Sequence, residues 1–178
     1  MKSTVFAAAL LGMGTESHAV IQGLYGSECL HVEGLSAYKD MAFDKDTLKQ
    51  VQTVFGDSEC SLPAYDFVFE GPYRIDEQLG YVDYSFDTIR LTPLSEGVAE
   101  NFNQYGLCGI TSWTAGKAEH VAGLNCGGQQ IPNLDTFVYD RIVDNRNGIQ
   151  MGRASEDLNG STPNHRPDEV DDVIYHAK

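Results

Sequence analysis

Short stretches with polar and apolar residues in alternation, separated by turn signals, dominate the chain from residue 20 onward. The strand-like runs cover residues 20–30, 37–43, 48–55, 65–70, 73–77 and 81–91. In the last run Val82, Tyr84 and Phe86 share one face, which predicts a half-buried strand. Residues 48–55 also have a period of two, but the pattern does not decide which face is buried. We predict a mainly β fold, an antiparallel β-barrel-like or strongly curved, lipocalin-like sheet.

One helix is expected to interrupt the strands near residues 95–105. Ser95 is a suitable N-cap, and Gly106 ends the pattern. Val98, Phe102 and Tyr105 lie at helical spacing and predict a narrow apolar stripe.

Two hairpins are expected after the helix. The first pairs residues 108–113 with 118–124 around residues 114–116. The second pairs residues 136–144 with 149–152, and its Asn147-Gly148 turn is a strong hairpin signal.

The two ends of the chain differ in composition from this β-rich domain, which spans residues 20–152. Residues 1–19 are interpreted as a signal peptide, because Lys2, a short apolar run and Ser17-His18-Ala19 follow the order of such a segment. Residues 153–178 are polar, acidic and aperiodic, and are expected to form a loosely ordered or surface-draped tail. The protein is therefore expected to be secreted or periplasmic.

The net charge of −14 restricts the expected partners. Such a surface repels phosphate backbones and anionic lipid headgroups, which argues against nucleic acid as a partner. The apolar run near the N-terminus is far shorter than the ~20 residues of a transmembrane helix, so no membrane span is expected. The sequence does not identify a protein partner.

Four cysteines follow the predicted cleavage site: Cys29, Cys60, Cys108 and Cys126. An even number in an exported chain indicates disulfides, of which three connectivities are possible. The pairs Cys29–Cys60 and Cys108–Cys126 are favoured because each closes a local loop, and each would stabilise the fold by about 3 to 4 kcal/mol. A structural zinc site is the alternative, but the close Cys-x-x-Cys pair typical of such sites is absent.

No catalytic residues, metal ligands or cofactor motifs are assigned from the sequence. It contains no Gly-x-Ser-x-Gly elbow, no phosphate-binding loop and no closely spaced histidine pair. Aromatic residues on the strand-like runs are the remaining candidates, either as core or as the lining of an apolar cavity. The candidate ligand-binding residues are Phe67, Phe69, Tyr73, Val82, Tyr84, Phe86 and Trp113.

Several short motifs resemble a known family. They are residues 38–43, the segment 55–63 with its Asp57-x-x-Cys60-x-x-Pro63 turn, Gly71-Pro72-Tyr73, Leu91-Thr92-Pro93, Cys108-Gly109 with Trp113, Gly152 and Arg166-Pro167. In this order they resemble the APCDDC domain, named for adenomatosis polyposis coli down-regulated proteins. The acidic bias and short signal suggest a bacterial, single-domain secreted member.

The resemblance implies a secreted β-barrel-like domain with a hydrophobic ligand space. Animal members carry two copies and antagonise Wnt signalling, and that role is not expected of a single copy. The leading hypothesis is a non-enzymatic protein that binds an apolar small molecule or lipid. A secreted hydrolase or isomerase with a dispersed Asp/Glu/His site, and a structural or adhesive envelope module, are the alternatives.

Overall fold

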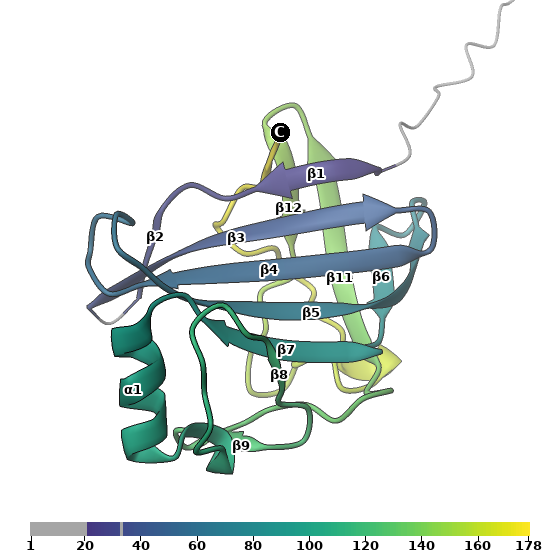
Figure 1. Cartoon of the computed structure of the whole chain (residues 1–178). Coiled ribbons are helices and arrows are strands. Elements are labelled where there is room, and N and C mark those ends of the chain that lie inside the picture. The colour runs from purple at the N-terminus through teal and green to yellow at the C-terminus, as the bar shows by residue number, and fades with distance from the viewer. Residues whose placement is uncertain (1–20, 33) are drawn as a thin grey trace, which may run out of the picture.

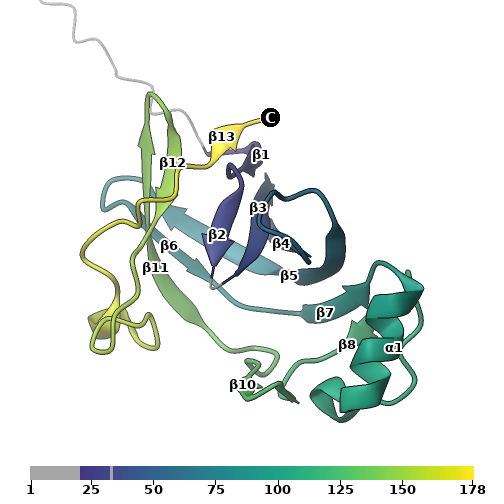
Figure 2. The same cartoon turned by 90° about the vertical axis from the view of Figure 1, so that its left-hand side faces the viewer.

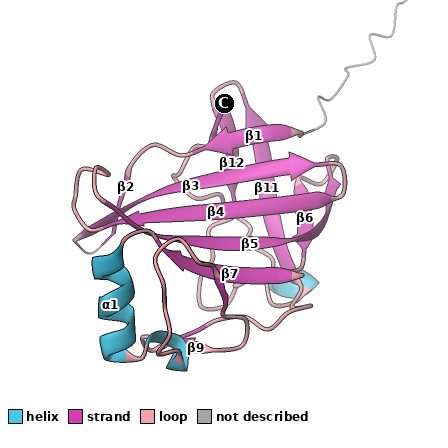
Figure 3. Cartoon of the chain, viewed as in Figure 1, coloured by secondary structure: helices cyan, strands magenta, loops and turns pink. Residues whose placement is uncertain are grey.

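The structure is a computed structural model that describes residues 21–32 and 34–178. It confirms the mainly β fold (Figures 1 and 3). The strands are β1 (Gly23–Gly26), β2 (Leu30–Val32), β3 (Leu35–Asp44), β4 (Thr47–Phe55), β5 (Pro63–Asp76), β6 (Tyr81–Tyr84), β7 (Thr88–Pro93), β8 (Glu119–His120), β9 (Asn125–Cys126), β10 (Gln129–Gln130), β11 (Val138–Asn145), β12 (Gly148–Met151) and β13 (His176–Ala177). The helices are α1 (Glu96–Tyr105) and two 3-10 turns, η1 (Leu107–Gly109) and η2 (Pro163–His165).

The main sheet is antiparallel and curls into a nearly closed barrel. Its strand order is β12-β11-β6-β5-β4-β3-β1-β13. The C-terminal segment joins the two ends of this order, because β13 pairs with β1 while Tyr175 exchanges backbone hydrogen bonds of 2.9 and 3.0 Å with Ile149 of β12. Figure 2 shows this segment crossing from β12 to β1.

Strand β5 changes its partner at Gly71. Residues 65–70 pair with β7, whereas residues 73–76 pair with β6. A Cβ atom at Gly71 would lie 2.1 Å from the Ser85 carbonyl oxygen, so glycine is required where the backbones approach. The expected single strand over 81–91 is therefore divided at Ser85–Asp87 into β6 and β7.

Helix α1 begins and ends where the sequence indicates. The Val98 N–H donates to the Ser95 hydroxyl, and Gly106 adopts the left-handed conformation with φ of 57°. Its buried residue is Ala99, and Phe102 packs beside it on the same core cluster. Tyr105 is 73% exposed, so the expected stripe ends one turn earlier.

Of the two expected hairpins, the second is confirmed and the first is wrong. Strands β11 and β12 pair in register across the turn, with Asn145 opposite Gly148. Residues 108–113 instead form η1 and irregular chain, because the Asn103 side chain takes the place of a partner strand. Its amide donates to the Trp113 carbonyl (3.0 Å) and its carbonyl accepts from the Trp113 N–H (2.7 Å).

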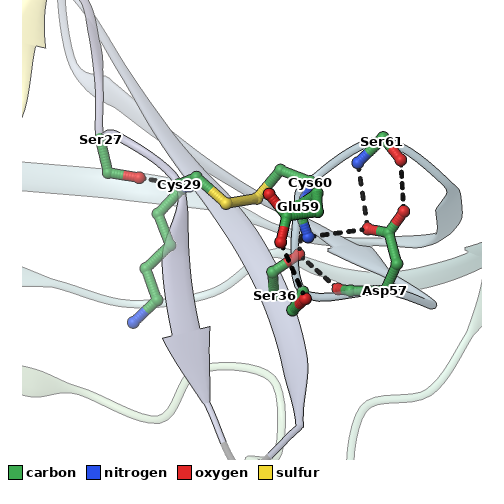
Figure 4. The surroundings of a disulfide bond; sticks show 9 residues. Ser27, Cys29, Ser36, Asp57, Glu59, Cys60 and Ser61 are labelled. Carbon is green, nitrogen blue, oxygen red and sulfur yellow. Dashed lines mark hydrogen bonds between the residues drawn. A yellow bond between two sulfur atoms is a disulfide. The ribbon is translucent and has the colours of Figure 1, made fainter.

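Two disulfides join Cys29 to Cys60 and Cys108 to Cys126, as predicted from their spacing. Figure 4 shows the first, which ties the segment before β2 to the loop between β4 and β5. In that loop the Asp57 side chain accepts bonds from the backbone N–H groups of Glu59 and Ser61 and from the Ser61 hydroxyl. The bridge is therefore seated in a loop that has its own hydrogen-bond network.

Residues 153–178 pack against the barrel, which agrees with the surface-draped alternative and not with a loosely ordered tail. Besides the pairing of β13, Gly152 forms a bridge with Val170, and Tyr175 is only 7% exposed. The Arg166 guanidinium donates to the backbone oxygens of Val82 (3.3 Å) and Asp140 (2.5 Å). Single anchoring residues make these contacts, so the segment has no hydrophobic periodicity from which its packing could be predicted.

Two clusters of buried side chains form the core. The first lies within the closing part of the barrel and contains Ile21, Met41, Phe43, Leu48, Val82, Ile142, Ile149, Met151 and Tyr175. The second lies between β7 and the α1–η1 region and contains Phe86, Ile89, Leu91, Ala99, Cys108, Trp113, Val121 and Ile131.

The interpreted signal peptide lies outside the described residues. Along residues 21–32 and 34–178, no helix has the length and apolar character needed to cross a membrane.

Candidate functional site

The strand alternation places polar side chains inside the barrel at mid-height. On β4 the inward row is Leu48, Gln50, Gln52 and Val54, which settles the face that the sequence left open. The two ends of this row are buried and apolar, with Leu48 3% and Val54 5% exposed. The two glutamines between them face Met41 and Lys39 across the β3–β4 pair.

These glutamines help to line a hollow of about 210 Å³, which we name the polar chamber. Its walls include the side chains of Lys39, Gln50, Gln52, Phe69, Tyr84, Asp140, Met151, Asp171 and Tyr175. The chamber thus joins residues from β3, β4, β5, β6, β11 and β12 with two residues of the C-terminal segment. Packing of that segment is what completes its wall.

Asp140 is the most unusual residue in the chamber wall. It lies on β11 two residues before Ile142, which is buried at 2% exposure, so alternation directs both side chains inward. Its Oδ1 accepts hydrogen bonds from the N–H groups of Arg141 (2.7 Å) and Gly152 (3.1 Å). Burial raises the pKa of Asp140 to about 6, although these two bonds and the nearby Arg166 charge act in the opposite direction.

Gly152 allows the chain to approach this carboxylate closely. A Cβ atom at position 152 would lie 2.3 Å from Oδ1 of Asp140 and 2.7 Å from Cβ of Pro167. A larger residue would therefore displace either the carboxylate or the docked C-terminal segment.

Two phenols lie near Asp140. Burial, followed by the charge of Asp140, raises the pKa of Tyr84, which also interacts by hydrogen bonding with Asp140 and Gln50. Burial raises the pKa of Tyr175 to about 12, and the charges of Asp171 and Asp140 act in the same direction. Both phenols are therefore neutral near pH 7 and are able to donate or accept hydrogen bonds.

Arg166 contacts β6 and β11 from outside the barrel. Its side chain is only 10% exposed and pairs with Asp83 at 2.6 Å. The guanidinium lies 4.2 Å from the centre of the Tyr81 ring. Because it also bonds to the Asp140 backbone, Arg166 fixes β6 and β11 at the point where they carry Tyr84 and Asp140 into the chamber.

A second hollow, of about 330 Å³, adjoins the polar chamber, and we name it the aromatic pocket. Its walls include Val54, Tyr65, Phe67, Phe69, Leu91, Phe102, Leu107 and Ile131. The rings of Phe67 and Phe69 lie 4.4 Å apart, and Tyr65 contacts Phe102 at 5.6 Å. Gln52 and Phe69 belong to the walls of both hollows, so the two spaces are neighbours on one concave face.

The candidate ligand-binding residues from the sequence fall into three groups. Phe67 and Phe69 line the aromatic pocket, and Phe69 and Tyr84 line the polar chamber. Tyr73 packs against Phe43 at 5.3 Å and borders a separate surface hollow with Phe137. The other three lie in the core clusters and line neither hollow: Val82, Phe86 and Trp113, at 0%, 6% and 3% exposure.

Sequence reasoning missed the polar residues of the chamber. Asp140 stands two residues after Val138 and two before Ile142, and this interrupted apolar row was a usable signal. Gln50 and Gln52 interrupt the row of Leu48 and Val54 in the same way. Tyr175 gave no such signal because it lies in an aperiodic segment.

No family model matches the chain, and no curated protein matches it. The resemblance to the APCDDC domain therefore stays a prediction from the motifs quoted above. Within residues 21–32 and 34–178, no group of three or more His, Cys, Asp or Glu side chains is arranged to hold a metal ion.

Proposed function

We propose that this chain is an exported, non-enzymatic binding protein that holds an apolar or lipid-like ligand on the concave face of its barrel. The observation that carries the proposal is the pair of adjoining hollows of different character. One is lined mainly by aromatic and aliphatic side chains, and the other by amides, phenols, carboxylates and one lysine. Ligand sites are commonly apolar spaces with a few convergent polar groups, with volumes of roughly 300 to 1,000 Å³.

The two hollows match the two parts of a lipid-like molecule. Each methylene group transferred from water into the aromatic pocket would contribute about 0.8 kcal/mol to binding. A polar end that left water would need hydrogen-bonding partners, because an unpaired buried polar group is costly. The polar chamber, which lies on the other side of the shared wall residues Gln52 and Phe69, offers such hydrogen-bonding partners.

Export is supported by two further features. The chain holds two disulfides, which persist in oxidising compartments. The interpreted signal peptide and the APCDDC resemblance favour the same location, and the resemblance also favours a hydrophobic ligand space.

Titration with an apolar fluorophore whose emission rises in apolar surroundings tests the proposal. We expect saturable binding with a Kd on the order of micromolar, near −8 kcal/mol. Leu107→Trp should weaken binding at least tenfold, because the larger side chain fills part of the aromatic pocket. Leu62→Trp is the matched control, since Leu62 is 63% exposed on the loop before β5.

Circular dichroism and thermal melting would establish that both variants are folded. A folded wild-type protein without saturable binding would refute the proposal and favour the structural module. Equal weakening by both substitutions would place the fluorophore outside the aromatic pocket.

A further inference from the structure

We infer that the polar chamber selects an alkylammonium head group, so that the preferred ligand is a long-chain amine. This inference rests on the proposed function and specifies the chemical class of its ligand. It is drawn from the charges, the rings and the hydrogen-bond acceptors that share the chamber.

The charges facing the chamber are mainly negative. Asp140 and Asp171 bring two carboxylates to its wall, against one ammonium group, that of Lys39. Asp40 also borders the chamber, but on β3 its side chain alternates with those of Lys39 and Met41 and points to the other face. The Asp40 carboxylate is already paired with Lys178 Nζ at 2.5 Å. Among the residues that the structure describes, no cationic side chain forms an ion pair with the Asp140 carboxylate.

The hydrogen bonds of Asp140 leave it able to accept from a ligand. Both of its backbone donors, the N–H groups of Arg141 and Gly152, bind the same oxygen, Oδ1. The second oxygen receives neither of these bonds, so we place the head group there, beside the Tyr84 phenol that also hydrogen-bonds to Asp140. An ionised carboxylate in a largely buried wall gains most from a cation, because attraction between charges is stronger away from bulk water.

The other wall residues suit an ammonium group as well. Phe69, Tyr84 and Tyr175 supply three aromatic rings, and cations are attracted to the faces of such rings. An alkylammonium head has three N–H donors and no acceptor, so it needs several acceptors around it. The carboxylate of Asp140 and the amide oxygens of Gln50 and Gln52 are of that kind.

An anionic head would meet the opposite conditions. A fatty-acid carboxylate placed beside Asp140 would bring two like charges together in a poorly hydrated space. Lys39 alone would attract it within the chamber wall. The chain as a whole carries a net charge of −14, which also steers cations toward the protein and anions away.

Three ligands with the same twelve-carbon chain test the inference: dodecylammonium, dodecanol and dodecanoate. Each would displace the fluorophore from the full chain at pH 7.5, below its micellar concentration. We expect the amine to bind at least tenfold more tightly than dodecanoate, with dodecanol between them. Asp140→Asn should remove most of the amine's advantage over dodecanol and leave dodecanol binding nearly unchanged.

Asp157→Asn is the matched control, because it removes the same charge from an exposed position away from the chamber. An equal loss of amine affinity in both variants would mean general attraction to an acidic surface and would overturn the inference. Lys39→Met gives a second test that leaves Asp140 in place. Because it removes a like charge from the wall, it should strengthen amine binding. A wild-type protein that prefers dodecanoate, and loses that preference in Lys39→Met, would place the head group at Lys39 and overturn the inference.

The result also separates the inference from the proposed function. If dodecanol, dodecanoate and the amine bind equally well, the lipid-like ligand stands and the amine selection fails. If no twelve-carbon ligand and no fluorophore binds the folded wild-type protein, the proposed function fails as well.

Discussion

Asp140→Asn should stabilise the protein at neutral pH, although the Asp140 carboxylate accepts two backbone hydrogen bonds. The amide has nearly the same shape as the carboxylate. Its oxygen can still accept from the N–H groups of Arg141 and Gly152, which both bind Oδ1 of Asp140. The substitution therefore removes the negative charge and leaves the hydrogen-bonded geometry in place.

The size of the effect follows from the shift in pKa. Burial raises the pKa of Asp140 from 3.8 to about 6. One pKa unit corresponds to about 1.4 kcal/mol, so ionising this group in the folded protein costs up to about 3 kcal/mol. Between pH 4 and 6 the folded state binds more protons than the unfolded chain. The contribution of Asp140 to stability is therefore complete below about pH 4 and is lost as the pH rises through about 6.

Urea unfolding of the wild type and Asp140→Asn at pH 4.0, 5.0, 6.0 and 7.5 would measure this dependence. The two proteins should have similar unfolding free energies at pH 4. At pH 7.5 the variant should be more stable by about 2 to 3 kcal/mol, or roughly 4 to 12 °C in Tm for a domain of this size. Asp157→Asn should change stability by less than about 0.5 kcal/mol at either pH, because Asp157 is exposed.

Two outcomes would refute the reasoning. A difference that does not vary between pH 4 and 7.5 would show that the titration of Asp140 is not its source. A variant that is less stable than the wild type at pH 7.5 would show that the Arg166 charge and the neighbouring phenols stabilise the carboxylate by more than burial destabilises it.

Three other changes test how the fold around the two hollows is held together. Replacing Cys108 and Cys126 by serine should lower the unfolding free energy by about 3 kcal/mol in urea titration, because the bridge restricts the unfolded chain over a separation of 18 residues. Arg166→Lys keeps the charge but loses the forked guanidinium donors that bind Val82, Asp140 and Asp83. Residues 153–178 should therefore become cleavable in limited proteolysis, and the unfolding free energy should fall by about 1.5 to 3 kcal/mol. Unchanged cleavage would contradict the anchoring role of Arg166. Gly152→Ala should lower the Tm because its Cβ meets Asp140 Oδ1, whereas Gly97→Ala in open space on α1 should raise it slightly.

The sequence predicted those parts of the fold that depend on local pattern. Asn147-Gly148 indicated the β11–β12 hairpin, and Ser95 with Gly106 indicated both ends of α1. The disulfide pairing also followed from spacing, because each bridge closes a local loop. For the hairpin and the helix, a short stretch of chain contains the residues that decide the structure.

The errors share a different cause, because each depends on a contact with a residue outside the run itself. The strand expected over 81–91 divides because β5 pairs with β7 before Gly71 and with β6 after it. The strand expected at 108–113 does not form because the Asn103 side chain satisfies the Trp113 backbone. No pattern within either run contains this information.

The chamber could be predicted in part, since its strand residues obey alternation. Asp140, Gln50 and Gln52 each interrupt an apolar inward row, and an interrupted row indicates a polar group inside a barrel. The sequence does not show that the three interruptions meet at one level, because that depends on the register of four strands. Nor does it show that Asp171 and Tyr175 close the wall.

The cost of the polar interior to the fold is a further argument for the proposed ligand. An aliphatic residue at position 140 would continue the row of Val138 and Ile142 and would avoid a cost of up to about 3 kcal/mol, a large part of the stability of an ordinary domain. The fold does not use this carboxylate to pair a buried cation, because Arg166 binds the Asp140 backbone from the outer face and reserves its ion pair for Asp83. On the proposed function, the partner of this charged group is a molecule that enters the hollow. A positive charge on that molecule would offset the free-energy cost of ionising Asp140 in the folded protein.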